Sequence, residues 1–265
     1  MEIPNTVTRI GDGALSNCRN LSGVTIPDSV TSIGNSAFFN CNDLPGVVIG
    51  DSVTRIGDKA FNSCNNLTSI TFSTSVSSIG KYAFNDCRSL TSVNIPDNVM
   101  IVGDAAFWGC TSLASVTIGN GLTSISNFAF ENCTSLASVT IGDSVTSIGW
   151  EAFQFCEALK NVNIPNSVIN IGRSAFYKCV SMTSVTIPDS VMNIGNTAFY
   201  RCSSVSSVTI GRSITSIGDH AFAKCDSITD VYYTGSKEQW NGIKISFGNK
   251  SIHDAIIHYD FTGSA

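Results

Sequence analysis

The sequence predicts a β-rich solenoid of ten stacked 23-residue repeats closed by a small C-terminal cap. Three observations lead to this prediction. Cysteine recurs ten times at a constant interval of 23 residues, several other positions repeat in step with it, and the pattern stops after Tyr233. Such internal periods are typical of solenoids, in which stacking buries the apolar face of each unit. We expect residues 1–233 to form the repeat array, starting within a repeat, and residues 234–265 to form the cap.

Each repeat contains one predicted strand, marked by a Leu-x-x-Val-x-Ile frame that begins three residues after the cysteine. The end of this frame alternates apolar and polar residues, as in a strand with one buried face. Pro or Gly and then Asp-Ser or a relative follow, which favours a turn. The cysteines that define the register are Cys18, Cys41, Cys64, Cys87, Cys110, Cys133, Cys156, Cys179, Cys202 and Cys225.

The second half of each repeat returns the chain to the interior. An apolar pair such as Val30 and Ile33 is followed by a recurrent glycine, which we expect at positive φ, and then by an Ala-Phe pair. The alanine allows close approach of backbone, and the phenylalanines are expected to stack in a column along the solenoid. Because strand-paired coils advance about 4.8 Å each, ten coils should span roughly 48 Å.

The units LTSVNIPDNVMIVGDAAFWGC and MTSVTIPDSVMNIGNTAFYRC resemble the repeats of BspA-like leucine-rich-repeat proteins over about residues 3–233. The segment VYYTGSKEQWNGIKISFGNKSIHDAIIHYDF resembles the closing segment that commonly follows such arrays. The resemblance implies a right-handed leucine-rich-repeat coil in a bacterial or protozoan surface protein, often linked to adhesion. The implied location is the cell surface or the exterior, with any export signal outside this segment. Departures are local, such as Leu15 in place of a column Phe, Ser126 in place of the glycine, and Pro45 within a strand.

The cap is predicted to begin with a short helix. Ser236 followed by Gln239 is a capping box, which would start a helix around Trp240. Residues 243–245 and 256–259 are predicted to form short strands.

Composition argues against several functions. The net charge is -5 and only 13% of residues are charged, so neither a nucleic-acid footprint nor a polybasic membrane segment is present. No apolar run approaches the roughly 18 residues of a membrane-spanning helix. No Cys-x-x-Cys pair occurs, and the histidines (His220, His253 and His258) are not grouped with a nucleophile. We therefore predict no enzyme activity, no cofactor and no metal site.

The ten cysteines are expected to form a buried, reduced ladder. In-register neighbours would lie about 4.8 Å apart, whereas a disulfide needs Cβ atoms near 3.8 Å. Free cysteine also behaves as a small buried hydrophobe. Metal or redox use is the alternative.

The candidate binding surface is the variable segment between the recurrent glycine and the cysteine, which is rich in aromatic residues. Clustered exposed apolar side chains tend to mark interaction sites, although some of these rings could fold back onto the edge of the core. The residues predicted to contact a partner are Phe39, Tyr82, Trp108, Trp150, Tyr177, Lys178, Tyr200 and Arg201, and Phe128 and Phe155 occupy the same flank.

Charge is uneven along the chain. Residues 89–159 contain no Lys or Arg, whereas residues 160–212 contain five basic residues against one acidic residue, Asp189. Lys178, Arg201 and Lys224 occupy the same position in successive repeats. Like charges about 5 Å apart destabilise a sheet, so an anionic partner is one explanation, and splayed, solvated side chains are the other.

These observations predict a non-catalytic surface module that binds a protein or glycan. The alternative is a structural spacer, which has no need of exposed aromatic residues. Ice binding is a lesser alternative because outward threonines such as Thr117 and Thr140 repeat along one strand face. Val48, Asn94, Asn163 and Tyr232 interrupt that threonine ladder.

Overall fold

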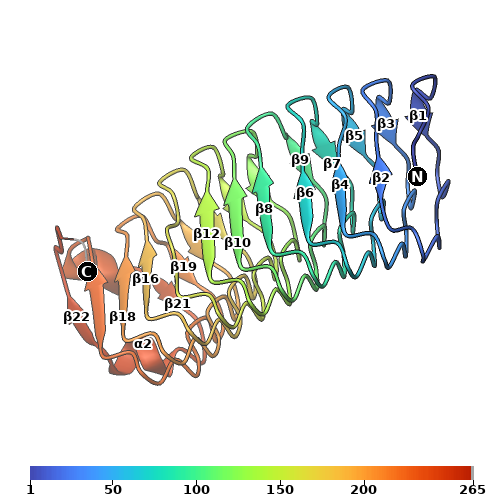
Figure 1. Ribbon diagram of the computed structural model, residues 1–265. Helices are drawn as coiled ribbons and strands as arrows, with labels where there is room; N and C mark the ends of the chain where they lie inside the picture. The colour runs from blue at the N-terminus through green and yellow to red at the C-terminus, as the bar shows by residue number, and fades with distance from the viewer. Residues whose placement is uncertain (264–265) are drawn as a thin grey trace.

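A computed structural model describes residues 1–263 and shows an elongated solenoid with the two termini at opposite ends (Figure 1). Two ladders of short parallel strands run along it, joined by turns. The predicted strand forms the first ladder, which consists of β2 (Val24–Thr25), β4 (Gly46–Val48), β6 (Ser69–Thr71), β8 (Ser92–Ile95), β10 (Ser115–Ile118), β12 (Ser138–Ile141), β14 (Asn161–Val162), β16 (Ser184–Ile187), β18 (Ser207–Ile210), β20 (Asp230–Tyr233) and β22 (Ile256–His258).

The second ladder lies where the apolar pair returns to the interior, and its strands have two residues each. The sequence frame did not mark this segment as a strand. Its members are β1 (Arg9–Ile10), β3 (Ser32–Ile33), β5 (Arg55–Ile56), β7 (Ser78–Ile79), β9 (Ile101–Val102), β11 (Ser124–Ile125), β13 (Ser147–Ile148), β15 (Asn170–Ile171), β17 (Asn193–Ile194), β19 (Ser216–Ile217) and β21 (Lys244–Ile245).

Pairing between repeats follows the 23-residue period. In β10 and β12, for example, Val116 pairs with Val139 and Thr117 with Thr140. The Val and Ile side chains of these strands are buried, and the Ser and Thr side chains point outward. β-Branched residues suit a half-buried pleated surface, so the alternation in the sequence determines which face is inside.

A column of stacked phenylalanine rings fills the interior, as predicted. Neighbouring ring centroids lie 4.9–5.5 Å apart, with planes within 10° of parallel. The column runs from Phe38 to Phe222, and each of its rings is fully buried. The alanine before each of these rings is also buried.

The cysteine ladder is confirmed for nine thiols and is wrong for Cys18. From Cys41 onward each cysteine is buried and reduced, and its Sγ–H donates to the carbonyl oxygen of the column residue 26 positions earlier, as from Cys64 to Phe38 at 3.2 Å. Cys18 is exposed because no coil lies over it on the N-terminal side. In the buried coils the same carbonyl oxygen also accepts the backbone N–H of the cysteine in its own coil, as from Cys41 to Phe38 at 3.3 Å, so the thiol adds a second hydrogen bond to this oxygen.

The recurrent glycine was expected at positive φ, and this expectation is wrong. Its role is close approach of backbone. A Cβ atom on Gly57 would lie 2.6 Å from the carbonyl carbon of Gly34, and one on Gly80 would lie 2.5 Å from the nitrogen of Asp58. Gly11, in the first coil, has nothing within 4 Å of that position. Close stacking on the preceding coil therefore favours glycine here, and Ser126, which holds this position in one coil, donates its hydroxyl to Val102 O of the preceding coil at 2.5 Å.

The C-terminal segment continues both ladders and adds two helices. Ser236 and Gln239 form the predicted capping box of α1 (Lys237–Asn241), and Trp240 packs edge-on against Tyr233 with centroids 5.2 Å apart. The strands β21 and β22 pair with β19 and β20. Helix α2 (Lys250–Asp254) was not predicted. Residues 264–265 of the expected cap lie outside the described residues.

Asn249 replaces the backbone partners of a further coil. Its side-chain oxygen accepts the Phe222 N–H at 3.0 Å, and its amide donates to Gly218 O at 2.9 Å and to Ser246 O at 2.8 Å. It is 1% exposed, so these bonds satisfy groups that are inaccessible to solvent.

Neither helix of residues 1–263 has the length and apolar character that crossing a membrane requires.

Candidate functional site

The aromatic flank, defined as the segment between the recurrent glycine and the cysteine of each coil, has an unusual backbone. Two positions per coil have positive φ, and the non-glycine residues there have values of 53–62°. Alternate N–H groups donate to the next coil, as from Phe38 to Ala60 at 2.7 Å and from Lys178 to Tyr200 at 2.8 Å. Equivalent positions therefore lie over one another, and their side chains form columns along the axis.

The predicted contact residues differ in exposure. Tyr82 is 41% exposed and Trp150 is 57% exposed. Arg201 is also exposed, whereas Phe39, Trp108, Tyr177, Lys178 and Tyr200 are half-buried. Folding of some rings onto the core edge, the alternative considered above, thus applies to part of this set.

Phe39 and Trp150 are not brought together with the others into one cluster. The column of Phe39 has Ser16 and Asn62 in the adjacent coils, and Trp150 occupies the position that is Asn127 and Arg173 in its neighbours. Two separate groups of residues on the flank do form local sites.

The first group, called the cationic patch here, consists of Phe155, Tyr177, Lys178, Tyr200 and Arg201. Tyr177 and Tyr200 stack with centroids 5.1 Å apart and planes 5° from parallel, and Phe155 meets Tyr177 edge-on at 5.5 Å. The Lys178 Nζ lies 4.9 Å from the Phe155 centroid, and the Arg201 guanidinium carbon lies 5.9 Å from that of Tyr200.

These contacts hold the cations over the rings. A cation above an aromatic face contributes about 0.5–1 kcal/mol at exposed sites, which offsets part of the repulsion within the Lys178–Arg201–Lys224 column. The charges remain at the surface, next to flat apolar rings. Such a surface can combine stacking with charge-assisted hydrogen bonds to a carboxylate, sulfate or phosphate.

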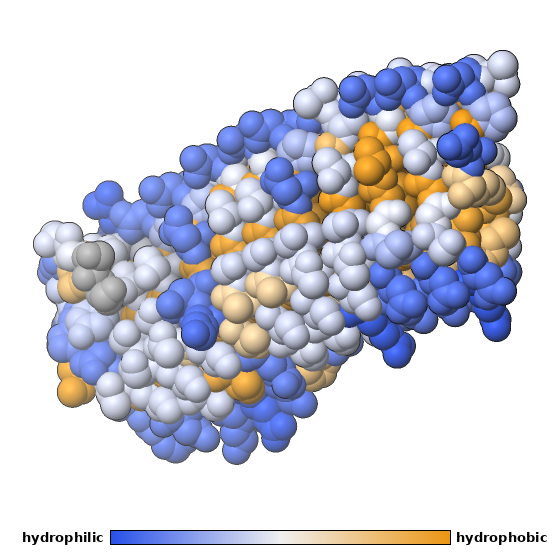
Figure 2. Space-filling model, in the orientation of Figure 1, coloured by the Kyte–Doolittle hydropathy of each residue, from blue (hydrophilic) through white to orange (hydrophobic). Residues whose placement is uncertain are grey.

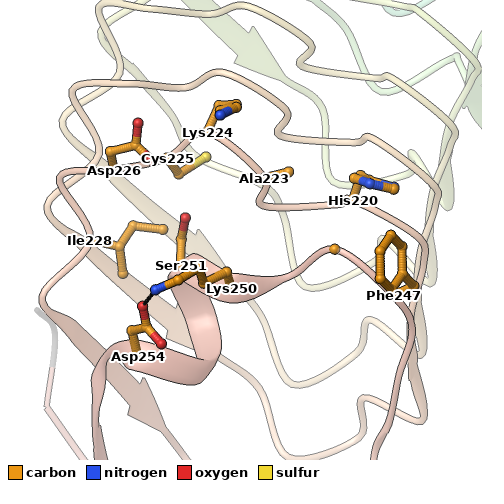
Figure 3. Close-up of a pocket in the computed structure, with 11 residues that line it drawn as sticks. His220, Ala223, Lys224, Cys225, Asp226, Ile228, Phe247, Lys250, Ser251 and Asp254 are labelled. Atoms are coloured by element: carbon orange, nitrogen blue, oxygen red, sulfur yellow. Dashed lines mark hydrogen bonds and ion pairs between the residues drawn. The ribbon is translucent and has the colours of Figure 1, made fainter.

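A cavity of about 470 Å³ lies where the Lys178–Arg201–Lys224 column meets the C-terminal segment (Figure 3). Lys224 and Asp226 of the last repeat lie on one side of it, and α2 contributes Ser251, Lys250 and Asp254 on the other. Lys250 pairs with Asp254 on the same helix. Lys224 follows Lys178 and Arg201 in the same column, so it extends this row of cations to the edge of the cavity.

The second group, called the acidic pocket here, surrounds a cavity of about 330 Å³. Its walls come from three successive coils and comprise Tyr82, Asn85, Ala105, Trp108, Phe128 and Glu131. Burial raises the pKa of Glu131, and the nearby Glu151 adds to this effect, while hydrogen bonds from Gln154 and Trp108 oppose it. Asn85, Ala105 and Glu131 were not singled out from the sequence. The sequence feature that could have revealed this pocket is Ala105, which lies between Tyr82 and Phe128 at equivalent positions of successive repeats.

Comparison with known proteins agrees with this architecture. The family model described as the BspA-type leucine-rich repeat region matches six copies, over residues 1–114, 77–202 and 123–251. The chain belongs to the BspA-type leucine-rich repeat family. A search of curated protein sequences gave no significant match.

Several solved structures resemble this BspA-type chain. A leucine-rich repeat protein from Bacteroides ovatus has 29% identity and a TM-score of 0.81, covering 98% of this chain and 70% of that one. A leucine-rich cell surface protein from Faecalibacterium prausnitzii has 27% identity and a TM-score of 0.52, covering 92% and 89%. The T. pallidum leucine-rich repeat protein has 31% identity and a TM-score of 0.58, covering 60% and 77%.

Proposed function

We propose that this BspA-type chain is a non-catalytic binding module of a bacterial cell-surface or secreted protein, and that its cationic patch recognises an anionic protein or glycan in an adhesive contact. The observation that carries the proposal is the stacked pair Tyr177 and Tyr200 with Lys178 and Arg201 held beside the rings. The similar protein from Faecalibacterium prausnitzii is described as a cell surface protein, which supports the location.

The patch has the features of a recognition surface. Tyr and Arg are enriched among residues that dominate binding energy, because they offer large contact area together with hydrogen bonding. Stacked rings are already ordered, so less conformational entropy is lost when a ligand covers them. The row continues to Lys224 at the edge of the C-terminal cavity, which gives an extended anion several points of contact.

Two other functions are less well supported. A structural spacer does not require aromatic rings on its flank. For ice binding, the threonine face should be flat and continuous, but the exposed Val48 pairs with Thr25 and Thr71, and Tyr232 pairs with Thr209. Figure 2 shows this face as pale, weakly polar surface broken by an apolar band.

The test is binding of the chain to an array of sulfated and carboxylated glycans and host glycoproteins. The double variant Tyr177→Ala/Tyr200→Ala should bind at least ~10-fold more weakly than the native chain, because aromatic anchors contribute about 2 kcal/mol or more. Trp150→Ala is the matched control, since it removes an exposed ring from the same flank outside the patch. Unchanged binding by the double variant, with loss on changing Thr186 and Thr117, would place recognition on the strand face.

A further inference from the structure

The acidic pocket arises from an interruption in a single column of the flank. Tyr82, Ala105 and Phe128 occupy equivalent positions in successive coils, with φ values of 55°, 55° and 60°. Two coil advances separate the two aromatic residues by about 10 Å along the axis, and Ala105 between them is 3% exposed and forms the floor. The missing ring leaves a space that is open to solvent between two aromatic walls.

Trp108 supplies a third aromatic wall from the neighbouring column. The coil that carries Ala105 also carries Trp108, which is half-buried, and Asn85 and Glu131 hold the equivalent positions in the adjacent coils. The Asn85 amide is already engaged, because its nitrogen donates to Trp108 O at 3.2 Å and its oxygen accepts from Asn62 at 2.8 Å. The side chains that face the space are therefore three rings and one carboxylate.

The Glu131 carboxylate has only neutral partners. Its Oε1 accepts from Gln154 at 3.2 Å and from Asn132 at 3.4 Å. No ion pair within residues 1–263 includes it. Its charged neighbour is another carboxylate, Glu151, whose own charge is paired with Arg173 at 2.5 Å. A half-buried anion without a cation is costly, so a positively charged ligand would be stabilised here.

We propose that the acidic pocket binds an alkylated ammonium group, with Tyr82, Trp108 and Phe128 around the cation and Glu131 as its counter-charge. Ring faces carry negative electrostatic potential and attract a weakly hydrated cation, which is the basis of aromatic cages for quaternary ammonium groups. A sugar would also stack on the rings but would leave Glu131 without a counter-charge. A sulfated ligand would be repelled by Glu131, so the pocket and the cationic patch select opposite charges.

The test compares choline with 3,3-dimethylbutan-1-ol, which has the same shape but carbon in place of the charged nitrogen. Titration calorimetry, with the change in tryptophan fluorescence as a second readout, should show that choline binds at least ~10-fold more tightly. Glu131→Gln, which keeps the shape and removes the charge, should weaken choline binding at least ~5-fold. Trp150→Ala and Tyr200→Ala, which lie outside the pocket, should leave choline binding unchanged.

A second variant fills the cavity and leaves the three aromatic residues and Glu131 unchanged. Ala105→Phe places a ring at a position where Tyr82 and Phe128 already hold rings at similar φ, so it should fold with an unchanged melting temperature and fail to bind choline. Equal affinity for choline and its neutral isostere would overturn the proposal. So would unaltered choline binding by Glu131→Gln, or binding of the neutral sugar cellobiose in place of choline.

The source of the ammonium group is distinguished by two further probes. A peptide containing trimethyllysine and vesicles of phosphatidylcholine both present the group, but the vesicles also present a phosphate. Because Glu131 repels that phosphate, the peptide should bind and the vesicles should not. Binding of neither free choline nor the peptide would exclude the assignment.

Discussion

The acidic pocket and the cationic patch have the same backbone and opposite surfaces. Both lie on the aromatic flank, both rest on the continuous phenylalanine column, and both use the same pair of positive-φ positions per coil. In the patch, adjacent coils carry Tyr177 and Tyr200 in one column, so the rings pack against each other. In the pocket, Ala105 separates two aromatic residues, so a cavity remains. The interior is thus kept constant while a few outward positions determine the shape and charge of each site.

The largest expected effect tests whether the interior is equivalent beneath the two sites. Phe107→Ala lies under the pocket and Phe199→Ala under the patch, and both rings are fully buried. Each should lower the free energy of unfolding by about 3–5 kcal/mol, because a cavity is left in a packed core. Urea denaturation measures this change. A decrease in the free energy of unfolding below about 1 kcal/mol for either variant would show that the phenylalanine column contributes little to stability beneath that site.

The next effect concerns the charge of the patch. Lys178→Ser/Arg201→Ser removes two cations and should weaken binding of a sulfated glycan by roughly 10-fold at low salt, as two charge-assisted contacts are lost. Added salt screens exposed charges, so the difference from the native chain should shrink in a salt titration. Glu131→Gln serves as the control in the other half and should not alter this binding. A salt-independent difference would mean that the side chains act by shape.

A smaller effect is expected from pH at the pocket. The pKa of Glu131 is raised by burial and by Glu151, whose carboxylate is paired with Arg173. Glu131 therefore becomes protonated at a higher pH than an ordinary glutamate, and protonation removes the counter-charge. Choline affinity should be constant near neutrality and should fall a few-fold as the pH is lowered toward the ordinary glutamate range, about 4–5. The affinity of Glu131→Gln should not follow this profile.

The smallest difference is expected in thiol reactivity, which should not distinguish the two halves. Burial raises the pKa of Cys41 to about 11 and that of Cys64 to about 12, and the thiols from Cys87 to Cys202 are also buried with raised pKa values. Thiolate is the reactive form, so alkylation at pH 8 should modify Cys18 alone, as counted by mass spectrometry. Labelling of Cys110 in the native chain would show that the coils beneath the acidic pocket unfold locally, and labelling of Cys179 would show the same for the coils beneath the cationic patch.

Much of the fold was determined by the sequence alone, because it depends on local pattern and on an exact period. The alternation of Val116 and Ile118 with polar residues predicts the strand, and the interval of 23 residues predicts its register. The Phe column, the nine-thiol ladder and the Ser236–Gln239 capping box follow from the same kind of information. The candidate residues Tyr177, Lys178, Tyr200 and Arg201 were also found in this way, since equivalent positions must lie over one another.

Only the tertiary structure decided what depends on contacts between coils. The recurrent glycine allows close approach to the preceding backbone, and positive φ falls instead on residues such as Tyr82 and Lys178. Cys18 is exposed because a position in the repeat does not reveal whether a coil covers it. Glu131 became a candidate once its neutral hydrogen-bond partners and the rings around it were known. The physical reason is that burial and the identity of a charge partner are properties of the assembled stack, whereas a repeat pattern describes each coil by itself.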